Sequence, residues 1–214
     1  MKIYRLPRET RALIFDMDLT LYSHAEYGRV QIDNLVAIAG KKRGLSFEEI
    51  NRELDASSKA WAESHDQKKP SLSNIILSWG FSMEENIKWR EEAYDPEKFL
   101  TKDPRLRQTL QSLSAYKLGI VTNNPVSIAR RTLACLGVED CFSVLVGLDT
   151  CMEPKPHRLP FAKISELMQV SPQQCVSIGD RYEIDLELPL EMGMGAILVN
   201  GVEDVYLLPR VFDF

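Results

Sequence analysis

Short apolar runs that end in polar residues recur along the chain. They cover residues 12–15, 117–122, 143–146, 175–178 and 196–199. Runs of this length, bounded by turn-forming residues, are typical of strands that are buried on both faces. Between the later runs the apolar residues recur every three or four positions, which indicates amphipathic helices. This alternation predicts an α/β protein with a parallel sheet and helices on both of its faces.

Residues 27–94 show a different pattern, in which no strand signal interrupts the helical spacing. Ile32, Leu35, Val36 and Ala39 lie three or four positions apart, as they do on the apolar face of a helix. This block therefore predicts a small all-helical segment inserted between the first run and the remainder of the α/β pattern.

Two helix starts inside this block have a recognisable chemistry. Ser46 is followed three residues later by Glu49, and Ser82 by Glu85. In such capping boxes the hydroxyl and the carboxylate bond to free amide groups of the first helical turn. The expected division is an α/β core domain formed by residues 1–22 and 95–214 and a helical cap domain formed by residues 23–94.

Composition limits the class of protein. The chain has 214 residues, of which 44% are hydrophobic and 27% charged, and its net charge is −5. A negative net charge gives no electrostatic reason for binding a polynucleotide. The four cysteines show neither zinc-ligand nor disulfide spacing. We find no signal-peptide pattern and no apolar stretch long enough to span a bilayer, so we expect a cytoplasmic protein without a membrane partner.

Polar residues follow the first two apolar runs. Asp16 and Asp18, with Thr20 behind them, come directly after residue 15, and Thr122 and Asn123 end the second run. Taken singly, an acidic pair is most often a solvated turn, and a threonine before a helix is most often a cap. Together they place carboxylates, a hydroxyl and an amide at the ends of two predicted strands.

The later runs are followed by polar residues as well. Lys155 lies between Pro154 and Pro156, and Asp180 and Asp185 follow the run that ends at residue 178. A lone lysine is usually a solvated charge, and carboxylates near a helix start usually cap it. The carboxyl ends of parallel strands meet at one edge of a sheet, however, so these groups are expected to lie together.

The order of these motifs, D-x-D-x-T-L, then T-N, then K-P, then G-D-x-x-x-x-D, resembles that of the haloacid dehalogenase superfamily of phosphohydrolases. The resemblance covers nearly the whole chain, and the helical block corresponds to the cap of that superfamily. It implies a Rossmann-like core and a Mg²⁺-dependent phosphomonoester hydrolase that forms a phospho-aspartyl intermediate. Leu19 departs from the small or polar residue that is often found at its position.

The resemblance also implies roles for the motif residues. Asp16 is the expected nucleophile, and Asp18 is expected to protonate the leaving alcohol and then to activate water. The residues expected to hold the transferring phosphoryl group are Thr122, Asn123 and Lys155. The residues expected around Mg²⁺ are Asp16, Asp18 through its backbone carbonyl, Asp180 and, through the water shell of the metal, Asp185.

Three other functions remain open. A true dehalogenase is expected to lack the second aspartate of the first motif, so Asp18 argues against it. A phosphomutase shares every residue named above and differs in returning the phosphoryl group to a sugar. A non-catalytic binding module is a different class of protein, but it has no use for mutually repelling carboxylates at one sheet edge.

The expected substrate is a small phosphorylated metabolite whose leaving group contacts the cap. Tyr22 and the segment after residue 94 resemble, more weakly, the pyrimidine 5′-nucleotidase branch, which makes a nucleoside 5′-monophosphate the leading candidate. Phosphoglycolate and sugar phosphates are the alternatives, and the oligomeric state stays open. The aromatic residues of the cap that either contact a base or pack its own core are Phe47, Trp61, Trp79 and Phe81.

Overall fold

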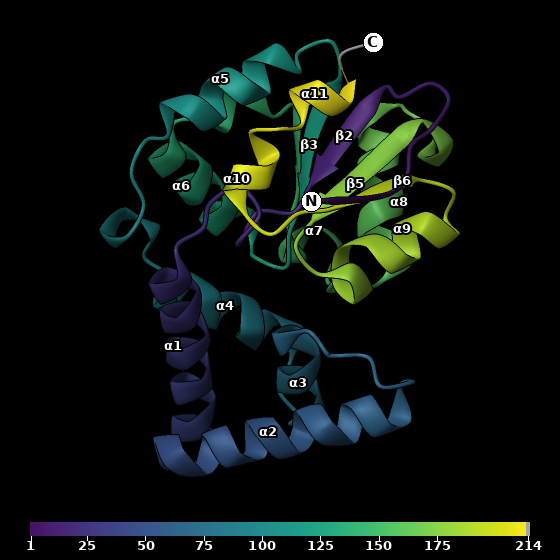
Figure 1. Cartoon of the computed structure of the whole chain (residues 1–214). Coiled ribbons are helices and arrows are strands. Elements are labelled where there is room, and N and C mark those ends of the chain that lie inside the picture. Colours follow the sequence, from purple (N-terminus) through teal and green to yellow (C-terminus); the bar gives the residue numbers. More distant parts are fainter. Residues whose placement is uncertain (213–214) are drawn as a thin grey trace.

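The computed structural model describes residues 1–212 and contains a six-stranded sheet (Figure 1). The strands stand in the order β1-β6-β5-β2-β3-β4 across the sheet. Their bounds are β1 (Lys2–Arg5), β2 (Ala12–Phe15), β3 (Lys117–Val121), β4 (Val144–Val146), β5 (Cys175–Gly179) and β6 (Gly195–Leu198). The first predicted strand, β2, therefore lies inside the sheet between β5 and β3.

All five predicted strands are confirmed, with ends that differ from the expected ones by at most one residue. They pair in parallel, β2 with β3 and β5, β3 with β4, and β5 with β6. Successive side chains of a strand point to opposite faces, so Leu13 and Phe15 contact one helical layer while Ala12 and Ile14 contact the other. The strand is apolar at every position because both of its faces are covered.

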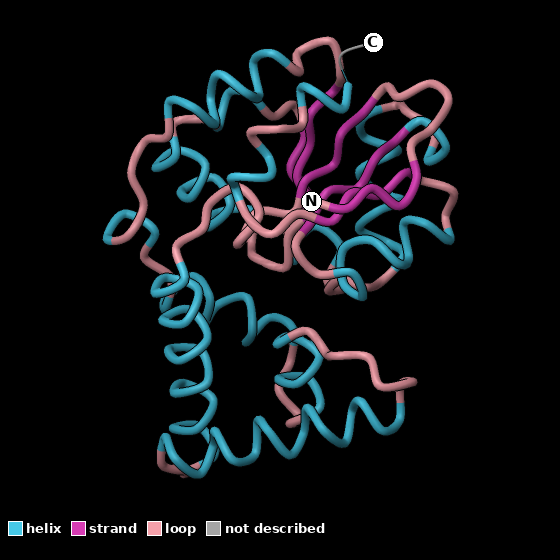
Figure 2. Tube along the Cα trace, viewed as in Figure 1, coloured by secondary structure: helices cyan, strands magenta, loops and turns pink. Residues whose placement is uncertain are grey.

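Helices cover the two faces of the sheet, as Figures 1 and 2 show. One layer consists of α5 (Pro104–Ser112), α6 (Val126–Leu136), α10 (Val202–Val205) and α11 (Pro209–Phe212), and the other contains α7 (Leu148–Cys151), α8 (Arg158–Met168) and α9 (Glu187–Glu191). Short 3₁₀ turns cover Pro96–Lys98, Glu139–Cys141 and Pro172–Gln174. None of the helices in residues 1–212 is long and apolar enough to cross a bilayer.

Strand β1 is the one strand of the described sheet that the hydrophobic pattern does not predict. It pairs antiparallel with β6 at the edge of the sheet, and all four of its residues are exposed. An exposed edge strand has no apolar run, because neither face is buried. The prediction of a parallel sheet is thus correct for five strands and incomplete at this edge.

The helical segment lies beyond the carboxyl ends of the strands (Figure 1). Its helices are α1 (Ala25–Arg43), α2 (Phe47–Ser64), α3 (Leu72–Ser78) and α4 (Met83–Ala93). Both predicted capping boxes are present, at Ser46 and at Ser82. Leu35, Ile76 and Trp89 form a small apolar cluster, which also takes in Ile128 of α6 and so joins the helical segment to the core. The division into a core domain and a cap domain at residues 22 and 94 remains a prediction.

Two apolar residues of this segment do not follow the expected pattern. Leu35, Val36 and Ala39 of α1 are buried, but Ile32 is 46% exposed, and Phe47 at the start of α2 is 49% exposed. Helical spacing predicts which residues share a face, but it does not predict which part of that face is covered. Ile32 lines a cavity between α1 and the carboxyl ends of the strands.

Candidate active site

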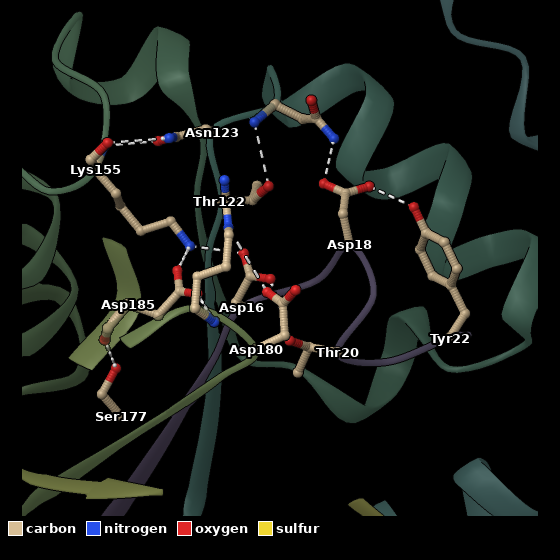
Figure 3. A network of polar contacts seen from close by, with 12 residues as sticks. Asp16, Asp18, Thr20, Tyr22, Thr122, Asn123, Lys155, Ser177, Asp180 and Asp185 are labelled. Carbon is tan, nitrogen blue, oxygen red and sulfur yellow. Dashed lines mark hydrogen bonds and ion pairs between the residues drawn. The ribbon is translucent and has the colours of Figure 1, made fainter. Parts of the chain in front are cut away.

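The carboxyl ends of adjacent strands bring the predicted site residues together (Figure 3). Asp16 follows β2, Thr122 follows β3 and Asp180 follows β5. The hydrogen bonds between the strands extend to Asp16 and Thr122. The Asp16 N–H donates to Ile178 O at 2.8 Å, and the Thr122 N–H donates to Val146 O at 3.0 Å. Parallel sheets bind ligands at this edge.

Lys155 lies at the centre of this group and is only 1% exposed. Its ammonium contacts Asp16 Oδ1 at 2.6 Å and Asp185 Oδ1 at 2.7 Å (Figure 3). Its backbone N–H donates to Asn123 Oδ1 at 2.6 Å, and its carbonyl accepts from Asn123 Nδ2 at 3.2 Å. The Asn123 side chain therefore fastens the Lys155 segment to the end of β3.

Asp185 reaches the site from a π-helical turn, Tyr182–Leu186, that follows β5. Ser177 Oγ donates to the Asp185 carbonyl at 2.7 Å, and the Arg181 N–H donates to Asp185 Oδ2 at 3.0 Å. A Cβ at Gly179 would clash with the Cβ of Asp185, so glycine permits this close approach. Such π-turns are frequent at functional sites.

The acidic group fits a hard divalent cation. Oxygens of Asp16, Asp180 and Asp185 lie within 4.8 Å of one another. Burial raises the pKa of Asp16 to about 7 against the opposing charge of Lys155, and burial together with Asp185 raises the pKa of Asp180 to about 6. Asp180 Oδ1 is buried without a hydrogen-bond partner in residues 1–212, although Arg181 Nε lies 3.8 Å away. Surplus carboxylate charge and oxygen-only donors suit Mg²⁺.

Asp18 lies apart from this acidic group, and hydrogen-bond donors hold its side chain in place. Tyr22 OH donates to Asp18 Oδ1, and Gln31 Nε2 donates to the same oxygen at 3.4 Å. Asn124 Nδ2 donates to Asp18 Oδ2 at 2.7 Å. The carboxylate is thereby fixed at the wall of the cavity that Asp16 also lines (Figure 3), where it can give or take a proton.

A cavity of about 250 Å³ separates the sheet edge from the helical segment. Asp16, Asp18 and Asp180 lie on its core side. The residues that the helical segment contributes include Gln31, Ile32, Ser71, Leu72 and Arg90. Ile32 lines this cavity, which accounts for its exposure.

The sequence profile of one protein family, described as haloacid dehalogenase-like hydrolase, matches residues 13–199. The chain belongs to this family. All four motifs, those of Asp16, Thr122, Lys155 and Asp180, lie within the matched range. The family assignment that the motif order suggested is therefore confirmed.

Curated relatives of this haloacid dehalogenase-like hydrolase include phosphoglycolate phosphatases. The enzyme of Shigella boydii serotype 4 (strain Sb227) is 27% identical over 192 residues, which are 80% of this chain and 74% of that relative. The enzyme of Xylella fastidiosa (strain Temecula1) is 40% identical over 80 residues, or 37% of this chain. That second match spans only about a third (34%) of the relative's length.

Solved structures show the same fold. A HAD phosphatase from Thermococcus onnurineus superposes with a TM-score of 0.64 at 23% identity, and the match covers 95% of this chain and 98% of that one. A β-phosphoglucomutase from Clostridium difficile gives a TM-score of 0.55 at 18% identity, with 94% and 99% coverage. At these identities the likeness supports the fold and not a particular substrate.

The aromatic residues considered for substrate contact in this haloacid dehalogenase-like hydrolase do not line the cavity at Asp16. Trp79 Nε1 donates to Ser57 Oγ at 2.9 Å, and Phe81 packs edge-on against Trp89. Trp61 stacks on His65, and Phe47 is exposed. The tyrosine that does line the cavity, Tyr94, belongs to the exit from the helical segment.

Two further residues of the site were not singled out from the sequence. Asn124 holds Asp18, and Arg90 of α4 donates to Asn124 Oδ1 at 2.8 Å. Asn124 stands next to the T-N motif, which could have drawn attention to it. Arg90 carries no such signal, because a single arginine in a helix is usually exposed.

Proposed function

We propose that this chain is a Mg²⁺-dependent phosphomonoester hydrolase that forms a phospho-aspartyl intermediate on Asp16. One observation carries the proposal: a buried aspartate, paired with a buried lysine, stands among further carboxylates beside a second aspartate that is held by donors. Such a set can supply a nucleophile, positive charge for the phosphoryl group and a proton carrier within one site. We further propose a cytoplasmic location and a small phosphorylated metabolite as partner.

In the first step an oxygen of Asp16 attacks phosphorus and the bond to the leaving alcohol oxygen breaks. Asp18 gives its proton to that oxygen, so the alcohol departs neutral. Lys155, Thr122 and the backbone N–H of Asn123 hold the phosphoryl oxygens. When held by Asp16, Asp180 and the Asp18 carbonyl, with Asp185 orienting its water shell, Mg²⁺ would neutralise negative charge on the nucleophile and on the phosphoryl group.

In the second step a water attacks the phosphorus of the phospho-aspartyl group. Asp18, now a carboxylate, takes the proton of that water, and Asp16 is regenerated as inorganic phosphate leaves. Tyr22 OH and Asn124 Nδ2 hold Asp18 in the same position for both proton transfers. The same groups would serve a mutase, in which a sugar hydroxyl takes the place of water.

The name phosphoglycolate phosphatase, shared by the curated relatives, favours a phosphorylated hydroxy acid or a sugar phosphate. The sequence flanks had instead favoured a nucleoside 5′-monophosphate. The fact that the four aromatic candidates lie away from the cavity also weakens the case for a base-binding site. We therefore rank phosphoglycolate and sugar phosphates above UMP and CMP as candidate substrates.

Phosphate release across these esters, measured with Mg²⁺ and with EDTA, tests the proposal. We expect turnover with Mg²⁺, its loss in EDTA and its return when Mg²⁺ is added back, because the acidic group cannot otherwise lose its surplus charge. Product analysis for a rearranged sugar phosphate separates hydrolase from mutase. Folded protein that releases no phosphate from any ester at millimolar Mg²⁺ would favour a binding module.

Asp18→Asn is expected to slow hydrolysis of alkyl phosphates by about 10²–10⁴-fold, because the amide can neither give nor take the proton. With p-nitrophenyl phosphate, whose leaving group needs no proton, the variant should form the intermediate and then stall. Rapid-quench kinetics should show a burst of about one equivalent of p-nitrophenol per enzyme, followed by slow turnover. If Asp18→Asn turns over both esters at the wild-type rate, Asp18 is not the proton carrier. The control is the exposed Asp140→Asn variant, which should behave as the wild type.

A further inference from the structure

Arg90 of α4 is a buried arginine that has no acidic partner among residues 1–212. It is 5% exposed and lines the cavity at Asp16. Its guanidinium donates to neutral acceptors, which are Asn86 Oδ1 at 3.1 Å, Tyr94 OH at 3.0 Å, Asn124 Oδ1 at 2.8 Å and Ser73 Oγ at 3.1 Å. By contrast Arg181, which also lines the cavity, has the carboxylate of Asp180 at 3.8 Å.

The positive charge of the Arg90 guanidinium is not compensated by a neighbouring negative charge in residues 1–212. Removing a charge from water is unfavourable unless an opposite charge compensates it, and hydroxyl and amide oxygens do so only in part. The contacts of Arg90 use four of its five N–H groups, so one N–H of Nη2 remains without a partner in residues 1–212. An anion in the adjoining cavity would supply both the missing charge and the missing acceptor.

The place of Arg90 indicates which part of a substrate it would meet. Asn124 accepts from Arg90 and donates to Asp18, so the guanidinium lies one side chain away from the proposed proton donor. That donor acts on the leaving oxygen. The transferring phosphoryl group already has a buried cation of its own in Lys155, next to Asp16. Arg90 therefore belongs to the leaving-group side of the cavity.

We propose that Arg90 binds a negatively charged group of the leaving alcohol, so that preferred substrates are phosphomonoesters with a second anion. A carboxylate and a second phosphate share the required chemistry, since both accept charge-assisted hydrogen bonds from a guanidinium. The inference rests on the proposed function for the identity of the leaving group. It goes further in assigning the selectivity to one side chain of the helical segment.

Matched esters test the proposal. Phosphoglycolate carries a carboxylate, 1,2-ethanediol bisphosphate carries a second phosphate, and 2-hydroxyethyl phosphate is a neutral analogue of similar size. Wild-type protein should give a higher kcat/KM for at least one anionic ester than for the neutral one, and the better of the two identifies the anion. Equal values for all three esters would overturn the proposal.

Arg90→Gln should lower kcat/KM for the preferred anionic ester about 10–100-fold more than for 2-hydroxyethyl phosphate, the scale of a lost charge-assisted hydrogen bond. Arg90→Lys should restore part of this preference, because it keeps the charge without the planar fork. Arg130→Gln removes an exposed arginine that pairs with Glu139 outside the cavity, and its preference should match that of the wild type.

The same loss on charged and neutral esters would mean that Arg90 only supports Asn124 and Asp18, and the proposal would be wrong. Calorimetric binding to the Asp16→Asn protein, with and without Arg90→Gln, gives a readout that needs no turnover. The anionic ester should bind more tightly than the neutral one, and Arg90→Gln should remove the difference. If the wild-type protein hydrolyses none of the esters but this binding pattern is observed, the proposed hydrolase function is wrong and the anion site at Arg90 is still supported.

Discussion

Asp16→Asn is expected to abolish phosphate release, with a fall in kcat on the order of 10⁴-fold or more, the scale on which loss of a nucleophile acts in other covalent enzymes. The amide keeps the shape of the side chain, but it is a poor nucleophile and a poor metal ligand. The fold should persist, because Thr20 Oγ1 can still contact the side chain and one repelling carboxylate is removed. Single-turnover phosphate release and circular dichroism measure both effects.

The matched control is Asp140→Asn, an exposed aspartate that pairs with Arg107 outside the cavity. It should keep wild-type kcat, since surface ion pairs contribute little. A second check is covalent: brief exposure of wild-type protein to substrate, followed by acid quench, should leave phosphate on the peptide that contains Asp16. Hydrolysis by Asp16→Asn near the wild-type rate would exclude Asp16 as the nucleophile.

Lys155→Met should give the largest change in stability, a loss of about 3–5 kcal/mol in the free energy of unfolding when Mg²⁺ is absent. Methionine fills a similar volume, but Asp16 and Asp185 lose their shared counter-charge in a buried position. Added Mg²⁺ should restore part of the loss, because a cation that binds only the folded state stabilises it. Urea unfolding at several Mg²⁺ concentrations measures these changes.

Lys163→Met is the control for this substitution. Lys163 pairs with Glu166 at 3.2 Å on the surface of α8, so its loss should change stability by less than about 0.5 kcal/mol. Lys155→Met combined with Asp16→Asn should be less unstable than the sum of the single effects, since the two side chains contact each other. Equal stabilities of the Lys155→Met and Lys163→Met proteins would contradict the buried-pair account.

The central strands and the residues that follow them could be predicted from the sequence for a simple reason. A strand buried on both faces must be apolar at every position, and the chain returns to the same sheet edge at each strand end. Asp16, Thr122 and Asp180 follow directly from that geometry. Asp185 was placed by its motif, although its π-turn and the room that Gly179 leaves for it are visible only in three dimensions.

Features that depend on contacts between distant segments were not predictable in this way. Nothing near β1 in the sequence marks it as a strand, since its partner is β6, almost two hundred residues further along the chain. The spacing of Ile32 predicts a core residue, and only the structure shows that it lines the cavity at Asp16. Arg90 looks like a surface charge, and only its contact with Asn124, 34 positions away, reveals its place in the site.

Both edges of the sheet are poor templates for another strand. β4 has three residues, and β1 has four, with an irregular register between Ile3 and Arg5. Arg5 Nε also donates to Met194 O at 2.8 Å, which keeps a charged group at that edge. Short, irregular and charged edges discourage pairing between chains. Two copies of this protein are therefore not expected to join by extending the sheet, and any self-association in concentrated solution should involve the helical surfaces.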